Sequence, residues 1–119
     1  MNTMLCGKNG EERAAALLID KGYTVLSRNF STNGGEIDII AQYKKMLVFI
    51  EVKTRSYRAY GGPMAAVTRS KQQKIVNTAL EYIKARRPKF DSIRFDVVCV
   101  LPEEITHIEN AFIPPRTIL

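Results

Sequence analysis

Four charged residues near the middle of the chain have the types and the spacing that chemistry on an anion needs. The segment from Gly35 to Arg55 reads GEIDIIAQYKKMLVFIEVKTR, with Glu36 and Asp38 in its first half and Glu51 and Lys53 in its second. Carboxylate oxygens are the ligands that hard divalent cations prefer. A neighbouring ammonium group can stabilise negative charge that develops during a reaction. We therefore interpret this segment as a candidate metal-dependent site.

The same segment predicts a β-hairpin. Residues 35 to about 42 alternate charged with aliphatic types, and residues 46 to 54 are rich in aliphatic and aromatic types. A two-residue turn at 44–45 sets three pairs opposite each other. They are Ile40 with Phe49, Asp38 with Glu51, and Glu36 with Lys53. Facing carboxylates destabilise a sheet unless a positive group lies between them, which a divalent cation beside Lys53 would supply. The alternative is a set of solvated charges on an exposed strand face.

The order of these residues resembles a nuclease signature. Asp38 followed by Glu51-Val52-Lys53 is similar to the acidic residue and Glu-x-Lys of the PD-(D/E)xK nuclease superfamily, with Ile37 where that name has Pro. Further motifs resemble the bacterial YraN-like family, which is similar to archaeal Holliday junction resolvases, and they span nearly the whole chain. These motifs are Gly10-Glu11-Glu12 with Ala14, Gly22-Tyr23, Arg28-Asn29-Phe30, Gly35-Glu36-Ile37-Asp38 and Phe95-Asp96-Val97-Val98.

The resemblance implies an endonuclease that hydrolyses phosphodiester bonds in branched or structured DNA with Mg²⁺ or Mn²⁺. The implied catalytic residues are Asp38, Glu51 and Lys53. Asp38 and Glu51 would hold the metal ion, with the Val52 carbonyl and Glu11 as further ligands. Glu36 would support the site as a partner of Lys53. For Glu11, the alternative is an acidic residue stabilised near a helix N-terminus.

Two other functions remain open from the sequence. One is a nucleic-acid-binding protein of the same fold with little or no catalysis, and the other is a purely structural interaction domain. Only the nuclease requires a metal ion and the intact carboxylates. Only the two nucleic-acid functions require a clustered basic face.

The charge distribution predicts an anionic partner, most simply DNA. The chain of 119 residues has a net charge of +6 and a pI near 9.5. The segment from residue 53 to residue 89 contains ten basic residues and a single acidic residue, Glu81. We expect phosphate contacts from this stretch. The predicted nucleic-acid-binding residues are Arg55, Arg58, Arg69, Lys71, Gln72 and Lys74. A solvated helix face is the alternative, and the loop 56–62 is predicted to contact the substrate.

The elements that must position the site follow from periodicity and capping. We expect a helix over about 8–21, a strand over 23–30, the two hairpin strands, a helix from Thr68 or Ser70 to about Arg87, a strand over 92–101 and an edge strand over 105–112. By resemblance this is the restriction-endonuclease-like αβββαβ core, an α/β fold. It has one mixed central sheet flanked by helices, an extra C-terminal edge strand, and a single domain over residues 1–119.

Several residues outside the hairpin have expected roles that are not catalytic. Asp96 lies within an apolar strand and needs a structural partner. His107, the only histidine, is predicted to lie on an exposed strand face, as is Arg28, unless Arg28 contacts a phosphate. Cys6 and Cys99 are predicted to be free thiols in a reducing cytoplasm.

The sequence has no apolar stretch of membrane-spanning length and no secretory signal pattern, so we expect a cytoplasmic protein with no membrane association. Resolvase-like enzymes act on two-fold junctions, and by that resemblance a homodimer is expected.

Overall fold

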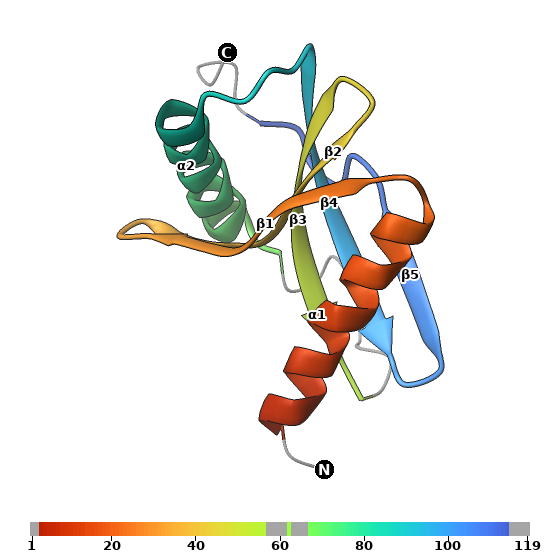
Figure 1. Cartoon of the computed structure of the whole chain (residues 1–119). Coiled ribbons are helices and arrows are strands. Elements are labelled where there is room, and N and C mark those ends of the chain that lie inside the picture. The colour runs from red at the N-terminus through yellow and green to blue at the C-terminus, as the bar shows by residue number, and fades with distance from the viewer. Residues whose placement is uncertain (1–2, 57–61, 63–66, 115–119) are drawn as a thin grey trace.

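Five strands and two helices make up the computed structural model, which describes residues 3–56, 62 and 67–114, with side chains from residue 9 onward. In chain order they are α1 (Thr3–Asp20), β1 (Thr24–Thr32), β2 (Gly35–Tyr43), β3 (Met46–Thr54), α2 (Arg69–Arg86), β4 (Ser92–Leu101) and β5 (Glu104–Ile108) (Figure 1). This order confirms the predicted α/β class and is consistent with a restriction-endonuclease-like core carrying an extra C-terminal strand.

The strands form one mixed sheet in the order β1-β2-β3-β4-β5. Strands β1 and β2, β2 and β3, and β4 and β5 pair antiparallel, whereas β3 and β4 pair parallel. A parallel pair cannot be closed by a tight turn, and here α2 lies in the crossover that joins β3 to β4. The crossover brings α2 to the sheet directly after the strand that carries Glu51 and Lys53.

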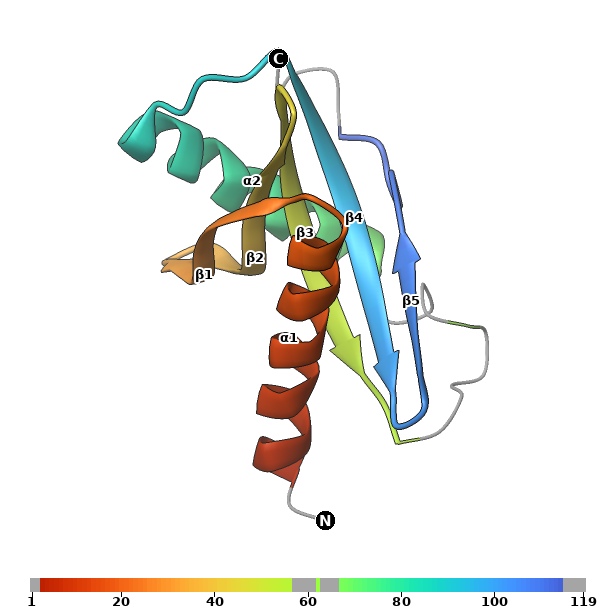
Figure 2. The ribbon, with the colours of Figure 1, turned by 45° about the vertical axis from the view of Figure 1, so that its right-hand side comes forward.

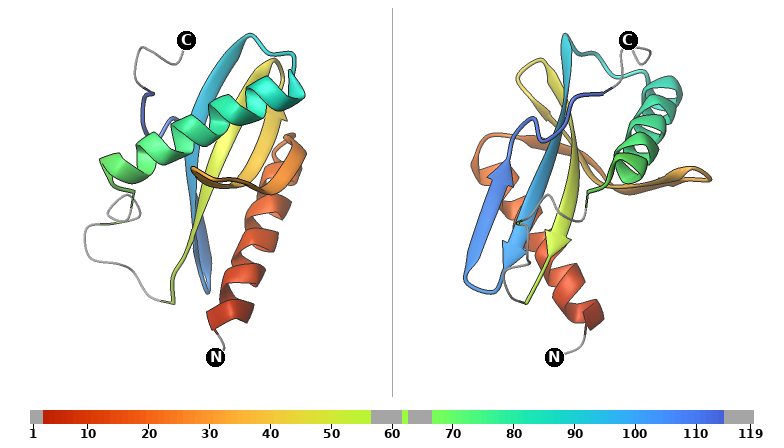
Figure 3. Two further views of the ribbon diagram at one scale, coloured as in Figure 1. Left: turned by 90° about the vertical axis from the view of Figure 1, so that its left-hand side faces the viewer. Right: turned by 180° about the vertical axis from the view of Figure 1, so that it is seen from behind.

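The two helices cover opposite faces of the sheet (Figures 2 and 3). On one face α1 packs Ala14 and Leu18 on Val48 and Ile50. On the other face α2 packs an apolar stripe on aromatic and aliphatic side chains of β3 and β4. This second cluster includes Ile75, Val76, Ala79 and Tyr82 with Leu47, Phe49, Phe95 and Val97. Because both faces are covered, β3 and β4 read as nearly continuous apolar runs.

The hairpin of β2 and β3 has the predicted register near its turn. Ile40 lies opposite Phe49 and Ile39 opposite Ile50, with Lys44 in the left-handed conformation at φ 56°. The ladder ends at the Ile39–Ile50 pair, so the two following residues, Asp38 and Glu51, are not paired through the backbone.

Both ends of α2 are capped as the sequence predicts. Thr68 is the N-cap, and its Oγ1 accepts the backbone N–H of Lys71 at 3.2 Å. Arg87 is the C-cap, with φ at 45° and its N–H bonded to Ile83 O, and Pro88 follows. This settles the N-cap in favour of Thr68 rather than Ser70.

Helix α1 begins at Thr3, five residues earlier than predicted, so Glu11 lies in its middle. The stabilisation of an acidic residue at a helix N-terminus therefore does not apply to Glu11. Gly10 lies where α1 meets the end of β3, and a Cβ at this position would collide with the Thr54 side chain. Gly10, a residue type of low helix propensity, thus allows α1 to pack closely against β3.

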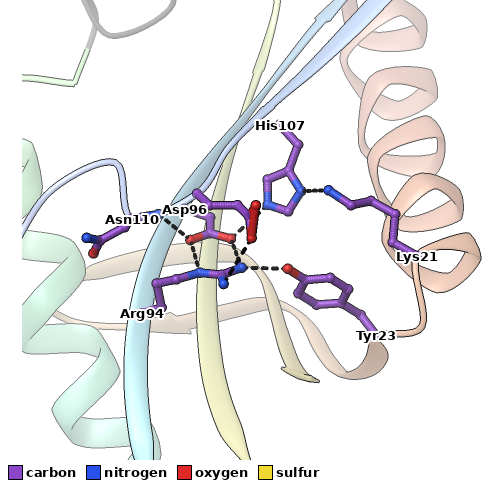
Figure 4. A network of polar contacts seen from close by, with 7 residues as sticks. Lys21, Tyr23, Arg94, Asp96, His107 and Asn110 are labelled. Carbon is purple, nitrogen blue, oxygen red and sulfur yellow. Dashed lines mark hydrogen bonds and ion pairs between the residues drawn. The ribbon is translucent and has the colours of Figure 1, made fainter. Parts of the chain in front are cut away.

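The structure corrects the prediction for His107 and bears out the partner expected for Asp96. Only 4% of the His107 side chain is exposed, and its Nε2 lies 2.7 Å from Asp96 Oδ2 (Figure 4). Arg94 donates to both Asp96 carboxylate oxygens, at 2.8 and 2.7 Å, and the N–H of Asn110 donates to Oδ1 at 2.9 Å. His107 turns inward because it completes this buried network, and β5 ends soon after it, at Ile108 rather than 112.

Two further expectations can be checked on the described residues. Cys99 is a buried free thiol, as predicted, whereas the Cys6 side chain lies outside the described part. Neither α1 nor α2 is long and apolar enough to cross a membrane, within the residues that the structure describes.

Candidate functional site

A pocket of about 300 Å³ opens where the hairpin of β2 and β3 meets α2. Its lining brings together residues from the two hairpin strands and from α2, which follows later in the chain. They are Gly35, Glu36 and Asp38 from β2, Glu51 from β3, and Lys71, Lys74 and Ile75 from α2. Five of these residues were predicted from the sequence as site residues, and the fold gathers them in one place.

Glu51 and Lys53 lie on the same face of β3, as the two-residue repeat of a strand requires. Only 9% of the Glu51 side chain and 11% of the Lys53 side chain are exposed. Lys53 Nζ lies 3.2 Å from Glu51 Oε1, and Lys71 Nζ from α2 lies 3.0 Å from the same oxygen. The buried carboxylate therefore contacts two ammonium groups.

Asp38 has an unusually high pKa, raised from 3.8 to about 7. Burial is the largest cause, and the negative charge of Glu51 adds to it, while the Val52 N–H bond lowers it. That N–H donates to Asp38 Oδ2 at 2.7 Å. Asp38 is thus a carboxyl group close to other acidic groups and poised to lose its proton near neutral pH. A cation beside it would favour the charged form.

The two lysines respond differently to this environment. Burial lowers the pKa of Lys53, and the contact with Lys71 lowers it further, against the attraction of Glu51. Burial also opposes the charge on Lys71, but contacts with Lys53 and Glu51 outweigh it and raise the Lys71 pKa. Lys53 is therefore the lysine that gives up a proton more readily, and Lys71 keeps its charge.

Glu11 of α1 belongs to the same acidic group. Burial raises its pKa, Arg28 lowers it, and the charges of Glu36 and Glu51 raise it further. With its amide nitrogen turned toward the two carboxylates, Asn29 donates to Glu11 Oε1 at 2.8 Å and to Glu36 Oε1 at 3.2 Å. Glu36 is thus held by Asn29, whereas the ion pair predicted between Glu36 and Lys53 is replaced by the Lys53–Glu51 contact.

Asn29 is a site residue that sequence reasoning missed. It has a φ of 53°, in the left-handed region that asparagine tolerates better than most residues. Its neighbour Arg28 is half-buried and pairs with Glu12 of α1 at 2.8 Å, so it does not lie on an open strand face as predicted. Both residues belong to the motif Arg28-Asn29-Phe30, which was recognised in the sequence. The motif was used only for the family resemblance, and no role was predicted for its asparagine.

The predicted nucleic-acid-binding residues separate into groups. Lys71 and Lys74 line the pocket with the carboxylates. Arg69 and Gln72 instead line a neighbouring hollow of about 330 Å³ that also contains Phe112. Residues of α2 line both hollows.

Two of the predicted phosphate contacts stand apart. Arg55 is half-buried, its Nη1 donating to Thr54 O at 3.0 Å, directly after the strand that carries Lys53. Arg58, and with it most of the loop 56–62, lies outside the described residues.

The donor set of the pocket suits a cation that keeps part of its water shell. Among the described residues, no group of three or more His, Cys, Asp or Glu side chains is arranged to hold a metal ion. Mg²⁺ typically takes one or two carboxylates together with waters and substrate phosphate. Asp38 and Glu51 fit that pattern, while metal ligation by Glu11 and the Val52 carbonyl stays a prediction.

The fold and the pocket define an α/β protein with a carboxylate–lysine cluster at the end of its central hairpin, and its mixed sheet is consistent with a restriction-endonuclease-like core. The model of the Uncharacterised protein family UPF0102 matches residues 10–100, and the chain belongs to this family. This is the YraN-like family that the sequence motifs predicted. Membership of the PD-(D/E)xK superfamily stays a prediction.

Relatives from distant bacteria match along almost the full chain. A UPF0102 protein of Phocaeicola vulgatus is 43% identical over 116 residues, covering 92% of this chain and 93% of its own. One of Thermodesulfovibrio yellowstonii is 45% identical over 106 residues, covering 89% and 94%. One of Caldanaerobacter subterraneus is 45% identical over 119 residues, covering 94% and 98%. The chain is therefore similar to these proteins over about nine tenths of its length.

Proposed function

We propose that this protein is a metal-dependent endonuclease that hydrolyses phosphodiester bonds in branched or structured DNA. The observation that carries the proposal is the position of Asp38, Glu51 and Lys53 at the end of one hairpin, with the charge of Glu51 raising the pKa of Asp38. Carboxylates brought this close cost stability unless a cation joins them, and such costs are typical of functional sites.

Asp38 and Glu51 would hold Mg²⁺ or Mn²⁺, with Glu11 and the Val52 carbonyl as further ligands. The ion would polarise the phosphodiester and lower the pKa of its bound water. The raised pKa of Asp38 supports this assignment, because a cation would stabilise the charged carboxylate that burial and Glu51 disfavour.

Three lysines of the chain would contact the phosphates of the substrate. Lys53 is buried next to Glu51 and would stabilise the negative charge that develops on the phosphate. Lys71 and Lys74 line the pocket from α2 and would contact the phosphate backbone. Arg69 and Gln72 would extend that contact along the helix.

A nucleic-acid-binding protein without catalysis is the second candidate, and a specific observation favours it. Glu51 is already neutralised by Lys53 and Lys71, and no three-ligand metal cluster exists among the described residues. In that function the lysines would bind phosphates and the carboxylates would only position the lysines.

The two functions are separated by incubating the purified protein with labelled duplex, flap and four-way junction DNA, with Mg²⁺, Mn²⁺ or EDTA. The nuclease predicts cleavage of at least one branched substrate with metal and none with EDTA. Binding to these substrates without cleavage under either metal would support the binding protein. Absence of binding would contradict both.

A further inference from the structure

Lys71 contacts the buried carboxylate of the hairpin from a different element, α2. Its Nζ is 3.0 Å from Glu51 Oε1, the oxygen that Lys53 Nζ approaches at 3.2 Å. We propose that Lys71 is a releasable counterion: it neutralises Glu51 until a divalent cation binds there, and it then transfers to a phosphate of the substrate. This inference rests on the metal-dependent function proposed above.

The two lysines on Glu51 differ in how freely they can leave. Lys53 belongs to the same strand as Glu51, and only 11% of its side chain is exposed. The Lys71 side chain belongs to a different element, α2, and 40% of it is exposed. Glu51 would keep Lys53 as a partner and gain the cation, so loss of the Lys71 contact would not leave its buried charge uncompensated. Lys71 is therefore the partner that a cation can replace.

The charges of the pocket also favour replacement of the Lys71 ammonium group by a divalent cation. The acidic and basic groups at the pocket are equal in number, namely three carboxyl groups (Glu36, Asp38 and Glu51) and three ammonium groups (Lys53, Lys71 and Lys74). A doubly charged cation added to this set would lie next to an ammonium group, and like charges at contact distance repel strongly in a partly buried site. Moving Lys71 outward relieves that repulsion and presents a positive charge to an incoming phosphate.

The helix can stay in place during this exchange. The Lys71 backbone N–H is held by the Thr68 N-cap at 3.2 Å, and Ile75, one turn along, is buried in the core beneath α2. Lysine has four rotatable side-chain bonds, so its ammonium group can swing while its Cα is fixed. Lys74 lines the same pocket and would receive the neighbouring part of the phosphate backbone.

Competition between Lys71 and the metal ion has a consequence that a plain phosphate contact lacks. Neutralising Lys71 should strengthen metal binding in the absence of DNA, because the cation no longer displaces an ammonium group. The same change should weaken DNA binding, because a phosphate contact is lost. One substitution is thus expected to move the two affinities in opposite directions.

The test is a titration of the DNA-free protein with Mn²⁺ alone, followed by calorimetry or by the electron paramagnetic resonance of free Mn²⁺. Lys71→Gln should bind Mn²⁺ about five- to ten-fold more tightly than the wild type, the gain expected from removing one ion pair and one repulsion. Lys71→Arg keeps the positive charge and should stay within about two-fold of the wild type. Lys74→Gln removes the same charge one turn away and should change Mn²⁺ affinity by about two-fold or less.

The outcomes distinguish this inference from the proposed function. If the wild type and Lys71→Gln bind Mn²⁺ equally well, or if Lys74→Gln tightens binding as much, the exchange is refuted while a metal-dependent nuclease still stands. If neither the wild type nor Lys71→Gln binds Mn²⁺, both proposals are refuted. Binding by Lys71→Gln alone, or more tightly than by the wild type, supports the exchange. A melting curve of each variant in EDTA checks that it is folded.

Discussion

The Asp38 carboxylate accepts the backbone N–H of Val52 at 2.7 Å, at the point where β2 and β3 stop pairing. A side-chain oxygen thus replaces a backbone acceptor between the two strands. Val52 lies between Glu51 and Lys53, so this bond fixes Asp38 relative to both neighbours. The same bond limits the rise of the Asp38 pKa that burial and Glu51 cause.

The pKa of Asp38 predicts how stability depends on pH. Its folded pKa of about 7 is higher than its unfolded value of 3.8, so its contribution to stability is full below 3.8 and is lost as pH rises through 7. Without metal, the wild type should lose up to about 1.4 kcal/mol per pH unit between those two pKa values from this group. Asp38→Asn should show a flatter dependence. Urea unfolding in EDTA at pH 5 and pH 8 measures the difference, and equal slopes for the two proteins would contradict the shift.

Metal binding should show the opposite dependence. Because a cation binds the charged Asp38 carboxylate, Mn²⁺ affinity should increase as pH rises toward and past 7, with release of a proton. Calorimetry in two buffers of different ionisation enthalpy counts that proton. A Mn²⁺ affinity that is constant between pH 6 and pH 8 would argue against Asp38 as a ligand.

The Asp96 network should be important for stability and not for activity. Asp96→Ala leaves the buried Arg94 guanidinium without its main partner, which typically costs about 3–5 kcal/mol. Glu109→Gln removes only the exposed partner of Arg94 and should cost less than about 1 kcal/mol. Urea unfolding at pH 7 compares the two variants. Similar, small losses in both would mean that the network contributes little.

Gly10 and Thr54 should be coupled. Gly10→Ala would normally favour a helix by about 1 kcal/mol, but here the new methyl group meets the Thr54 side chain, and overpacking typically costs about 1–3 kcal/mol. The double variant with Thr54→Ala should recover most of the loss. Unfolding free energies of the two single variants and the double variant give the coupling, and additive effects would contradict the close approach of α1 to β3.

Sequence reasoning predicted the elements whose apolar runs are long and cleanly bounded. Strands Met46–Thr54 and Ser92–Leu101 have the predicted bounds because both are buried on two faces and flanked by polar residues. The start of α1 was predicted at residue 8, directly after Gly7, because glycine has low helix propensity, whereas the helix begins at Thr3. Only the packed structure shows that Gly10 allows close contact with Thr54.

The site was predictable where it depends on one hairpin and was missed where it depends on contacts between distant elements. The alternation of side chains along β3 was enough to place Glu51 and Lys53 together. The contact of Lys71 with Glu51 depends on how α2 crosses the sheet, and the bridge from Asn29 depends on a left-handed residue in β1. The burial of His107 depends on its contact with Asp96 of the neighbouring strand, and the residue pattern of β5 alone does not reveal that contact.

The central claim is tested most directly by single-turnover cleavage of a four-way junction by Asp38→Asn, with the wild type and Lys45→Gln, an exposed lysine in the β2–β3 turn, as controls. Asparagine keeps the shape of the side chain and removes the charge that a hard cation needs. We predict metal-dependent cleavage by the wild type and Lys45→Gln, and a loss of about 100-fold or more for Asp38→Asn, with DNA binding retained. Cleavage by Asp38→Asn at the wild-type rate would contradict the account.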